Sequence, residues 1–407
     1  MKAAPEHAWR RQAPTAEDDA GTLLGDRKYR PDVEGLRAVA VVAVILFHTK
    51  IAGFTGGFIG VDVFYVISGF VITGVLLRKV ESSNSLGFGD FYARRARRIL
   101  PAAGLVLVVT VLASYHWLGF VRGAEVADDA RWCAVFLANF HFLSTGTNYF
   151  SSQLPPSPLQ NYWSLAVEEQ FYLVYPLGLA LSLLVIPRIS VRHKVMIFTG
   201  VIVAVSLWWS IDQTSADPYS AYLSSLTRAW ELALGGFVTA GTQYWLRIRR
   251  PVGVCLTWVG IAGILFAGLH YTSSTPYPGW AAIVPVVGAG LIIVGGMSAG
   301  RWGVELILGT LAFRWVGKLS YSLYLWSWPV LTIAEQETTK SLTLGQRALT
   351  IPASLALAAV TYFVIENPIR HSKWIARNWW KGILLGVVII GIVLLVATLE
   401  LHSTHTL

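Results

Sequence analysis

Residues 57–77 read GFIGVDVFYVISGFVITGVLL, an apolar run in which Asp62 is the single charged residue. A helix needs about 20 predominantly apolar residues to cross the hydrocarbon core of a bilayer, and this run has that length. Inside lipid the backbone must satisfy its own hydrogen bonds, which a helix does within one segment. The run therefore predicts a membrane-spanning helix.

Similar apolar segments recur along the chain, and the composition agrees with them. Hydrophobic residues make up 54% of the 407 residues and charged residues 14%, with a mean hydropathy of +0.55, whereas soluble domains carry about 25% charged residues. We therefore predict an all-α protein, a polytopic membrane bundle of about 11 transmembrane helices. The predicted spans are residues 36–52, 57–77, 99–119, 164–186, 195–211, 229–246, 252–270, 280–298, 315–334, 348–365 and 382–399.

The loops between these spans differ in charge. If the N-terminus is cytoplasmic, all but six of the 32 Lys and Arg residues lie on the cytoplasmic side, where membrane proteins carry their excess of these residues. We therefore predict a cytoplasmic N-terminus and an extracytoplasmic C-terminus in the plasma or inner membrane. Because topology explains the net charge of +9, nucleic acid is not an expected partner. The six exceptions are Lys50, Arg122, Arg131, Arg228, Lys340 and Arg347.

A shorter apolar stretch, residues 132–146, contains Asn139 and His141. Its hydropathy alone leaves open whether it spans the membrane, enters and returns, or lies along the interface. If it crossed, every later loop would change sides and the charge asymmetry would be lost. We predict that it does not cross.

The ends of the chain and its cysteines complete this organisation. Residues 1–32 mix both signs of charge and are expected to form a loosely ordered cytoplasmic tail, without a cleavable signal peptide. Residues 33–370 form the predicted membrane domain, and residues 371–407 add a C-terminal transmembrane helix with a short external tail. Cys133 and Cys255 lie in apolar surroundings, so we interpret them as packing residues rather than disulfide partners or metal ligands. No metal is expected.

Charged side chains inside a membrane are costly and usually functional, and the first such pair is Arg37 and His48 in GLRAVAVVAVILFH. Eleven positions separate them, about 16 Å along a helix, and they lie nearly on one face. Arg37 falls near the cytoplasmic side and His48 near the outer side. A neutral imidazole can take a proton from an attacking hydroxyl. Alternatively, His48 forms an interfacial hydrogen bond and Arg37 is a snorkelling anchor.

The segment FYARRARRILP, residues 91–101, places Arg95 and Arg98 three positions apart at the cytoplasmic start of a span. Guanidinium groups bind phosphate in a planar fork geometry. The segment therefore suits a cytoplasmic phosphate-bearing ligand such as a coenzyme A thioester. The more ordinary interpretation is a positive-inside topology signal.

Two carboxylates, Glu168 and Glu169, stand inside the apolar segment NYWSLAVEEQFY, residues 161–172. Adjacent residues of a helix are about 100° apart, so we expect the two side chains to face different neighbours. One would orient a catalytic group, and the other would hold the backbone or another helix. A structural ion pair within the bundle is the alternative.

Two further polar groups occur in predicted spans. Arg228 and Glu231 are three residues apart and can pair, which favours a structural or pocket-shaping role. Asp62 and Ser68 lie in a glycine-rich span whose small residues allow close helix approach. From these residues alone, an enzyme that hands a group across the membrane and a proton-coupled transporter both remain possible.

Seven strings, in order along residues 30–370, resemble the acyltransferase-3 family of membrane O-acyltransferases. The resemblance implies that the family's Arg-x10-His pair falls on Arg37 and His48, its Arg-x-x-Arg motif on Arg95 and Arg98, and its carboxylate motif on Glu168 and Glu169. The strings are RPDVEGLRAVAVVAVILFH, GGFIGVDVFYVISGF, FYARRARRILPA, YWSLAVEEQFYLVYP, RAWELALGG, GKLSYSLYLWSWP and IENPIR.

The resemblance also implies an activity. Family members are thought to draw acyl-CoA from the cytoplasm and to modify an acceptor at or beyond the outer leaflet. His48, Glu168 and Glu169 would be catalytic, and Arg37, Arg95 and Arg98 would bind acyl-CoA, most simply acetyl-CoA. The expected acceptor is a cell-envelope glycan or glycolipid, for example trehalose monomycolate. A macrolide antibiotic is the alternative acceptor, and a transporter or flippase of acylated lipid or glycan is the alternative function.

The chain departs from its relatives in two places. Many relatives read WHWP where this chain reads Trp326-Ser327-Trp328-Pro329, so no role for that histidine is carried over. Relatives with this N-terminal pattern often continue into an extracellular SGNH hydrolase-like domain, which this sequence does not contain. We therefore expect either a separate extracytoplasmic partner or direct acylation by the bundle.

Overall fold

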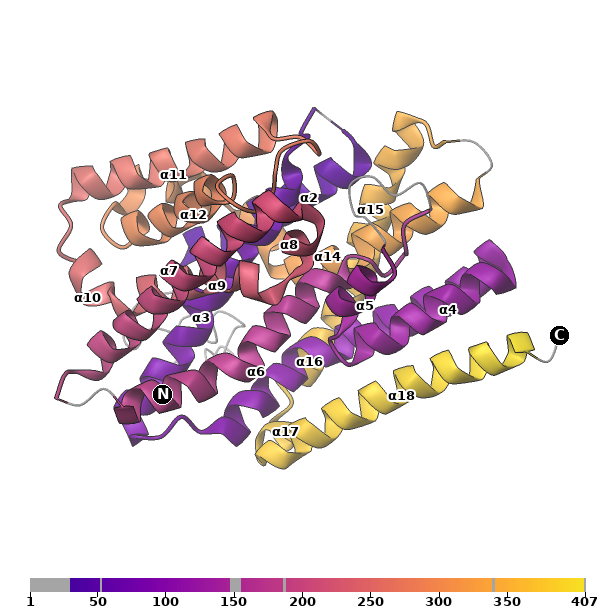
Figure 1. Cartoon of the computed structure of the whole chain (residues 1–407), viewed down its shortest axis with the longest axis horizontal. Helices are drawn as coiled ribbons and strands as arrows, with labels where there is room; N and C mark the ends of the chain where they lie inside the picture. The colour runs from indigo at the N-terminus through magenta and orange to yellow at the C-terminus, as the bar shows by residue number, and fades with distance from the viewer. Residues whose placement is uncertain (1–29, 52, 147–154, 186–187, 339–340, 406–407) are drawn as a thin grey trace, which may run out of the picture.

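The computed structural model describes residues 30–51, 53–146, 155–185, 188–338 and 341–405 (Figure 1). These residues form helices and connecting turns, which confirms the all-α prediction. The predicted tail, apart from its last residues, lies outside the described ranges. The helices are α2 (Pro31–Thr49), η2 (Gly57–Ile59), α3 (Gly60–Ser83), α4 (Phe88–Ala134), α5 (Ala138–Ser144), α6 (Tyr162–Val185), α7 (Val191–Ala216), α8 (Pro218–Leu223), α9 (Ser225–Ala240), α10 (Thr242–Trp245), α11 (Arg250–His270), α12 (Ile283–Gly296), η3 (Gly300–Trp302), α13 (Glu305–Leu308), α14 (Leu311–Glu337), α15 (Leu344–Thr361), η4 (Tyr362–Glu366), α16 (Asn367–Arg370), α17 (Lys373–Ala376) and α18 (Trp379–His405).

Within the described ranges, six helical stretches are long and apolar enough to cross a membrane. Each of the eleven predicted spans coincides with helix, but several are shorter or carry charge: α9 has 16 residues and α12 has 14. The count of eleven spans and the sidedness of the termini therefore stay predictions. The six stretches are Gly57–Ser83, Phe88–Ala134, Val191–Ala216, Arg250–His270, Leu344–Ala376 and Trp379–His402.

The short stretch, residues 132–146, does not form a spanning helix. It contains the end of α4 and the seven-residue α5, which is about 10 Å long at 1.5 Å per residue. Asn139 is 1% exposed; its side chain donates to the Leu223 carbonyl at 3.1 Å and accepts from Gln170 of α6 at 2.8 Å. These buried hydrogen bonds fix one face of α5 to the bundle, whereas Phe140 on its other face is exposed.

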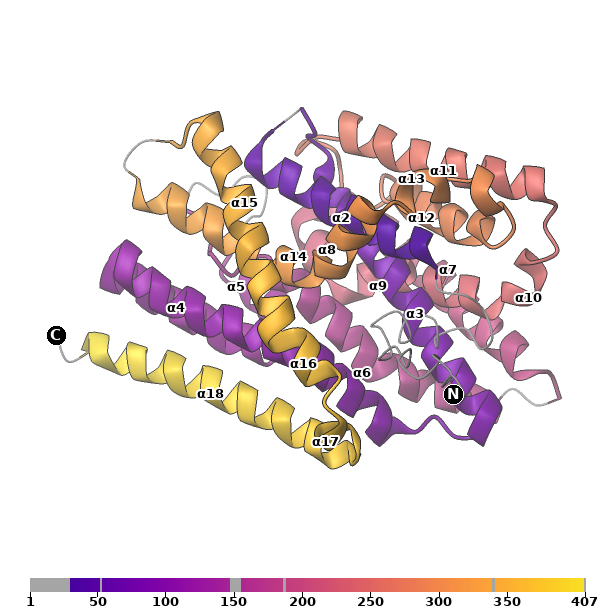
Figure 2. The same ribbon diagram turned by 180° about the vertical axis from the view of Figure 1, so that it is seen from behind.

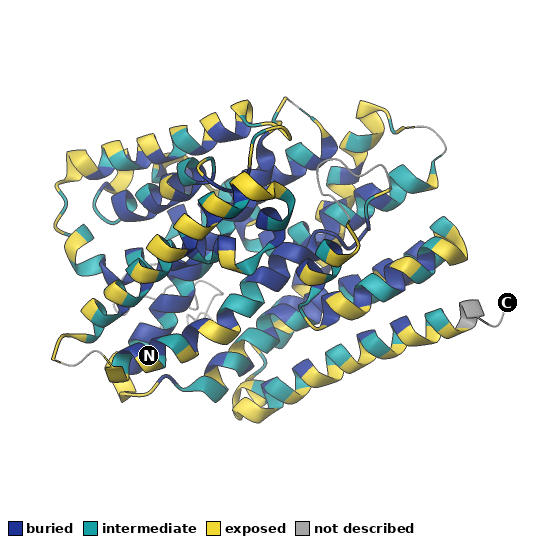
Figure 3. Cartoon of the chain, in the orientation of Figure 1, coloured by how far each residue is buried: buried dark blue, intermediate teal, exposed yellow. Residues whose placement is uncertain are grey.

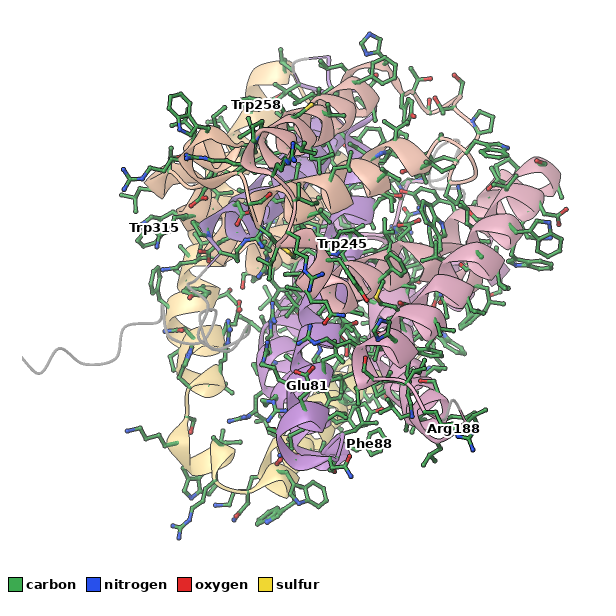
Figure 4. The ribbon with its side chains drawn as sticks, turned by 90° about the vertical axis from the view of Figure 1, so that its left-hand side faces the viewer. Glu81, Phe88, Arg188, Trp245, Trp258 and Trp315 are labelled. Carbon is green, nitrogen blue, oxygen red and sulfur yellow. The ribbon has the colours of Figure 1, made fainter. Side chains whose placement is uncertain are left out.

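Loops predicted to share a side of the membrane gather at one end of the molecule. Glu81, Phe88 and Arg188, which come from the loops around α3, α4 and α7, lie at the end that faces the viewer in Figure 4. In Figure 1 the end of α14, the start of α15 and the end of α18 lie at the opposite end.

The buried core lies where α2, α3, α9 and α14 meet, whereas the outer faces of α7, α11 and α18 are largely exposed (Figure 3). Figures 1 and 2 show α18 lying along α4. Many exposed residues on these outer helices are large and apolar, including Trp208, Phe266 and Val387. Such a surface suits contact with lipid rather than water.

The two cysteines differ in their surroundings. Cys133 is buried near the end of α4, as predicted for a packing residue, and it is not in a disulfide. Cys255 is exposed, so its interpretation as a packing residue is wrong. The reason is that α11 lies at the edge of the bundle, where only 33% of its most apolar stretch of 18 residues is buried.

The glycines of α3 allow α9 to approach closely, as their small size predicted. A Cβ atom added to Gly69 would lie 1.8 Å from the backbone oxygen of Leu232, and one added to Gly235 would lie 2.0 Å from that of Val66. Neither contact can relax by moving a flexible side chain. Only glycine therefore fits this crossing.

Gly69→Ala is expected to destabilise the protein by about 1–3 kcal/mol, the usual cost of overpacking a core. The matched control is Gly391→Ala in α18, where an added Cβ meets nothing within 4 Å. The temperature at which the detergent-solubilised protein loses its monodisperse size-exclusion peak reports the difference. Equal temperatures for the two variants would contradict the predicted crossing.

Candidate functional site

Five helices, α2, α3, α4, α6 and α14, enclose a cavity of about 90 Å³. Of the predicted site residues, four line it, so segments far apart in the sequence meet around one space. Aromatic side chains cover much of the remaining wall. Its lining residues include Arg37, Arg95, Arg98, Glu168, Val61, Phe64, Tyr65, Ser68, Val71, Ser164, Tyr172, Ser320, Tyr321 and Tyr324.

Arg95 is held by both carboxylates of α6. Its Nη2 atom is 2.8 Å from Glu169 Oε1 and 3.6 Å from Glu168 Oε1, and its guanidinium carbon lies 3.9 Å from the centroid of the Tyr172 ring. Ser68 and Tyr172 also donate to Glu168, at 2.8 and 2.6 Å. Both glutamates thus reach one guanidinium on α4, as in the alternative interpretation of an ion pair within the bundle, whereas Ser68 and Tyr172 contact Glu168 alone.

Arg37 and Arg98 are in a different position. Neither forms a hydrogen bond or ion pair with another described residue, although Arg98 lies within electrostatic range of Arg37, Arg95 and Arg370. Like charges gathered in a confined space raise the local affinity for an anion. Arg37, which was expected near the cytoplasmic entrance, instead lines the buried cavity.

A larger cavity of about 970 Å³, the vestibule, adjoins the first and shares Val71, Arg95 and Arg98 with it. One face of α3 lines both spaces, from Val61 to Ser82, which is about 30 Å at 1.5 Å per residue. Glu81 carries the only carboxylate among the residues that line the vestibule. Its Arg and Lys residues are Arg78, Lys79, Arg94, Arg95, Arg97, Arg98, Arg370 and Lys373.

Sequence reasoning missed one part of this vestibule. Arg370 and Lys373 come from α16 and α17, more than 270 residues after Arg95, and line the vestibule together with residues of α3 and α4. The string IENPIR was the one signal that pointed to this region. Lys and Arg in loops are so common on the cytoplasmic side of membrane proteins that charge alone does not distinguish a wall of a site.

His48 is buried but lines neither cavity. Its imidazole, in a residue that is 8% exposed, lies against Trp328 with ring centroids 4.4 Å apart. Trp328 stands one turn of α14 beyond Tyr324, which lines the cavity. No described contact joins His48 to Glu168 or Glu169, so the glutamates contact Arg95 rather than the imidazole. Ser327, at the position of the relatives' histidine, hydrogen-bonds to its own helix at Tyr324 O.

A second ionic cluster lies outside both cavities. Arg228 Nη1 is 2.9 Å from Glu231, which confirms the predicted pair, and 3.0 Å from Asp62 of α3. All three residues are 0% exposed. The guanidinium also lies over the rings of Tyr222 and Tyr277. The cluster joins α3 to α9, in keeping with the structural role expected from the sequence.

Comparison with known proteins identifies the family. A family described as "Acyltransferase domain" matches residues 30–399. The chain is 34% identical over 377 residues to peptidoglycan O-acetyltransferase OatA of Listeria monocytogenes, covering 89% of this chain and 58% of that protein. It is 31% identical over 366 residues to the protein named "Putative peptidoglycan O-acetyltransferase YrhL" of Bacillus subtilis, covering 84% and 55%. The chain thus spans little more than half the length of these relatives.

No solved structure gives a significant match. The family match nevertheless covers most of the sequence, including α2, α3, α4, α6 and α14 around the cavity. It also extends over most of α18. On this evidence the chain belongs to the acyltransferase-3 family.

Proposed function

We propose that this protein transfers an acyl group, acetyl in the simplest case, from cytoplasmic acyl-CoA to a hydroxyl of a cell-envelope glycan or glycolipid. The observation that supports it most is that a strongly basic vestibule adjoins a smaller cavity and shares Arg95 and Arg98 with it. Coenzyme A carries its phosphates at one end of a flexible arm and the thioester at the other. The vestibule suits the phosphates, and the aromatic cavity suits the thioester.

The arginines would divide the work of binding. Arg98 and Arg37 have donors to offer an anion, since neither forms a salt bridge with a described carboxylate, although Glu34 and Glu366 lie within electrostatic range of Arg37. Planar guanidinium groups donate two parallel hydrogen bonds to phosphate oxygens. Arg95, already held by Glu168 and Glu169, would set the shape and charge of the neck between the two cavities. The two glutamates would thus act on donor binding through Arg95.

The chemistry is an acyl substitution. The acceptor oxygen attacks the thioester carbonyl carbon, the carbon–sulfur bond breaks, and coenzyme A leaves as the thiol after its sulfur gains a proton. We propose that His48 acts as a general base. It would take the proton of the acceptor hydroxyl and pass it to the leaving sulfur. In the other form of the mechanism, His48 first receives the acyl group and then yields it to the acceptor.

The names of the relatives direct the choice of acceptor. Because two of them are named peptidoglycan O-acetyltransferases, wall glycan is the first acceptor to test, and an envelope glycolipid such as trehalose monomycolate is the second. Those proteins are considerably longer than this chain. A separate extracytoplasmic partner would complete the transfer if the bundle alone does not reach the acceptor.

His48→Ala is expected to reduce acyl transfer by at least about 100-fold, since a positioned general acid–base contributes 10²–10⁴-fold. Membranes that contain the protein would receive isotope-labelled acetyl-CoA, and label would be counted in wall glycan and in extracted glycolipid. His270→Ala, at an exposed residue of α11, is the matched control. Undiminished labelling by the His48 variant removes the imidazole from the mechanism. Movement of an acylated glycan without any labelling supports the transporter instead.

A further inference from the structure

We propose that Phe64 and Tyr324 form an end wall that limits the donor to short acyl groups. This inference rests on the proposed function, because it concerns the same cavity. It adds what limits the length of the acyl chain and which residues set that limit. Phe64 lies about two turns of α3 away from Val71, which the cavity shares with the vestibule.

The wall is built from two helices and fixed by a third. The rings of Phe64 in α3 and Tyr324 in α14 meet edge to face, with centroids 6.2 Å apart. The Tyr324 hydroxyl lies 2.6 Å from Ser164 Oγ and donates to the Asn161 carbonyl at 3.0 Å, and both partners flank the start of α6. Tyr324 cannot turn aside without losing both hydrogen bonds, and each typically contributes about 0.5–1.5 kcal/mol.

The space in front of the wall is small. A water-sized group needs about 10–15 Å³ of such a cavity, so the 90 Å³ measured here holds on the order of seven such groups. This suffices for a thioester, a two-carbon acyl group and the last atoms of the donor's arm. It does not also hold six or more further methylene groups. The vestibule, at 970 Å³, imposes no such limit, so selection falls on the acyl end.

Because of the direction of α3, the position of the wall sets the longest acyl chain that the cavity accepts. Its cavity-lining face runs from Ser82 in the vestibule, past Val71, to Phe64 and Val61. A donor whose phosphates are held at the arginines therefore extends along α3 until its acyl end meets Phe64. A methylene group added at that end has to displace fixed aromatic rings. We expect each two-carbon extension beyond the limit to lower kcat/KM at least about fivefold.

The test compares acetyl-, butyryl-, hexanoyl- and octanoyl-CoA as donors for the full chain in proteoliposomes, with release of free coenzyme A and product mass as readouts. The wild type should lose activity steeply as the chain lengthens. Phe64→Ala should raise the ratio of hexanoyl to acetyl kcat/KM at least tenfold. Phe70→Ala is the matched control, since Phe70 is buried in α3 but lines neither cavity. It should keep the wild-type profile.

Two milder variants keep the test decisive if Phe64→Ala does not fold. Phe64→Leu shortens the wall while preserving an apolar contact, and Tyr324→Phe removes both hydrogen bonds while preserving the ring. Either should broaden the profile toward butyryl and hexanoyl donors. An unchanged profile in folded, active wall variants overturns the inference, as does equal use of all four donors by the wild type. Failure of every donor with the wild type would instead overturn the proposed function.

Discussion

Replacing Arg98 with alanine is expected to weaken acyl-CoA binding by about 10- to 100-fold and to leave the fold intact. A hydrogen bond to a charged group is worth about 1.5–3 kcal/mol, and each 1.4 kcal/mol is tenfold in affinity. The fold should survive because Arg98 forms no salt bridge with a described carboxylate and interacts with Glu366 and Glu169 only at longer range. Saturable binding of labelled acetyl-CoA to purified protein in nanodiscs measures the loss. The size-exclusion profile measures the fold.

The neighbouring substitution Arg95→Ala should behave differently. It would leave Glu168 and Glu169 without their cation, and breaking a buried ion pair costs about 3–5 kcal/mol. The side chains here are 11–20% exposed, so we expect somewhat less, seen first as a lower yield of monodisperse protein. Arg95→Ala combined with Glu169→Gln should recover part of that yield without restoring acyl-CoA binding. If both single variants were equally stable and equally poor at binding, the two arginines would be equivalent.

The different surroundings of Arg95 and Arg98 show what the sequence alone could and could not predict. The spacing of Arg95 and Arg98 places both at one end of a helix, which the structure confirms. Their partners depend on which helix lies alongside, and α6 brings its glutamates from 74 positions later in the chain. Helical spacing describes the face of one helix and carries no information about a neighbour's reach. For the same reason the convergence of Glu168 and Glu169 on one guanidinium could not be predicted.

The fold was predictable where the hydrophobic pattern was strong. The run at residues 57–77 became α3 with its preceding turn, and residues 132–146 contain only the end of α4 and the short α5. Segments with buried charges or fewer residues, such as α9 and α12, fall short of a spanning helix by length and composition. Their apolar character serves contacts within the bundle as well as with lipid, and hydropathy does not separate the two uses.

His48 illustrates the limit for the site. Its distance from Arg37 along α2 follows from helix geometry, but its aromatic neighbour Trp328 comes from α14. The string GKLSYSLYLWSWP contained both Tyr324 and Trp328 four residues apart, a spacing that places them on one helix face. Sequence could therefore suggest a shared face, but not that His48 lies against it.

Arg228→Met is expected to abolish the folded protein, the largest effect on stability that we predict. Arg228, Asp62 and Glu231 are all fully buried, so the substitution would leave two carboxylates in the core without a cation. Removing one partner of a buried pair costs about 3–5 kcal/mol, comparable with the whole stability of many domains. Yield and melting temperature of the detergent-solubilised protein measure the loss.

The charge balance of this cluster sharpens the prediction. Two carboxylates face one guanidinium in a space without water contact, so one of the acids must hold a proton for the cluster to be neutral. Glu231→Gln supplies that neutral partner permanently and should fold as well as the wild type. A triple variant, Asp62→Asn, Arg228→Met and Glu231→Gln, should recover much of the stability lost by Arg228→Met alone. Equal yields of Arg228→Met and Glu231→Gln would refute the assignment.

The cluster also connects stability with the proposed activity. On α3, Asp62 points to α9, whereas Val61, Phe64 and Tyr65 line the cavity. The ion cluster therefore holds α3 by the face that points to α9, whereas another face of α3 lines the donor cavity. Partial loosening, as expected in Arg228→Lys, should shift the end wall before the protein unfolds. We expect that variant to use longer acyl donors more readily than the wild type at temperatures where both remain monodisperse, and an unaltered donor profile would separate the ion cluster from the wall.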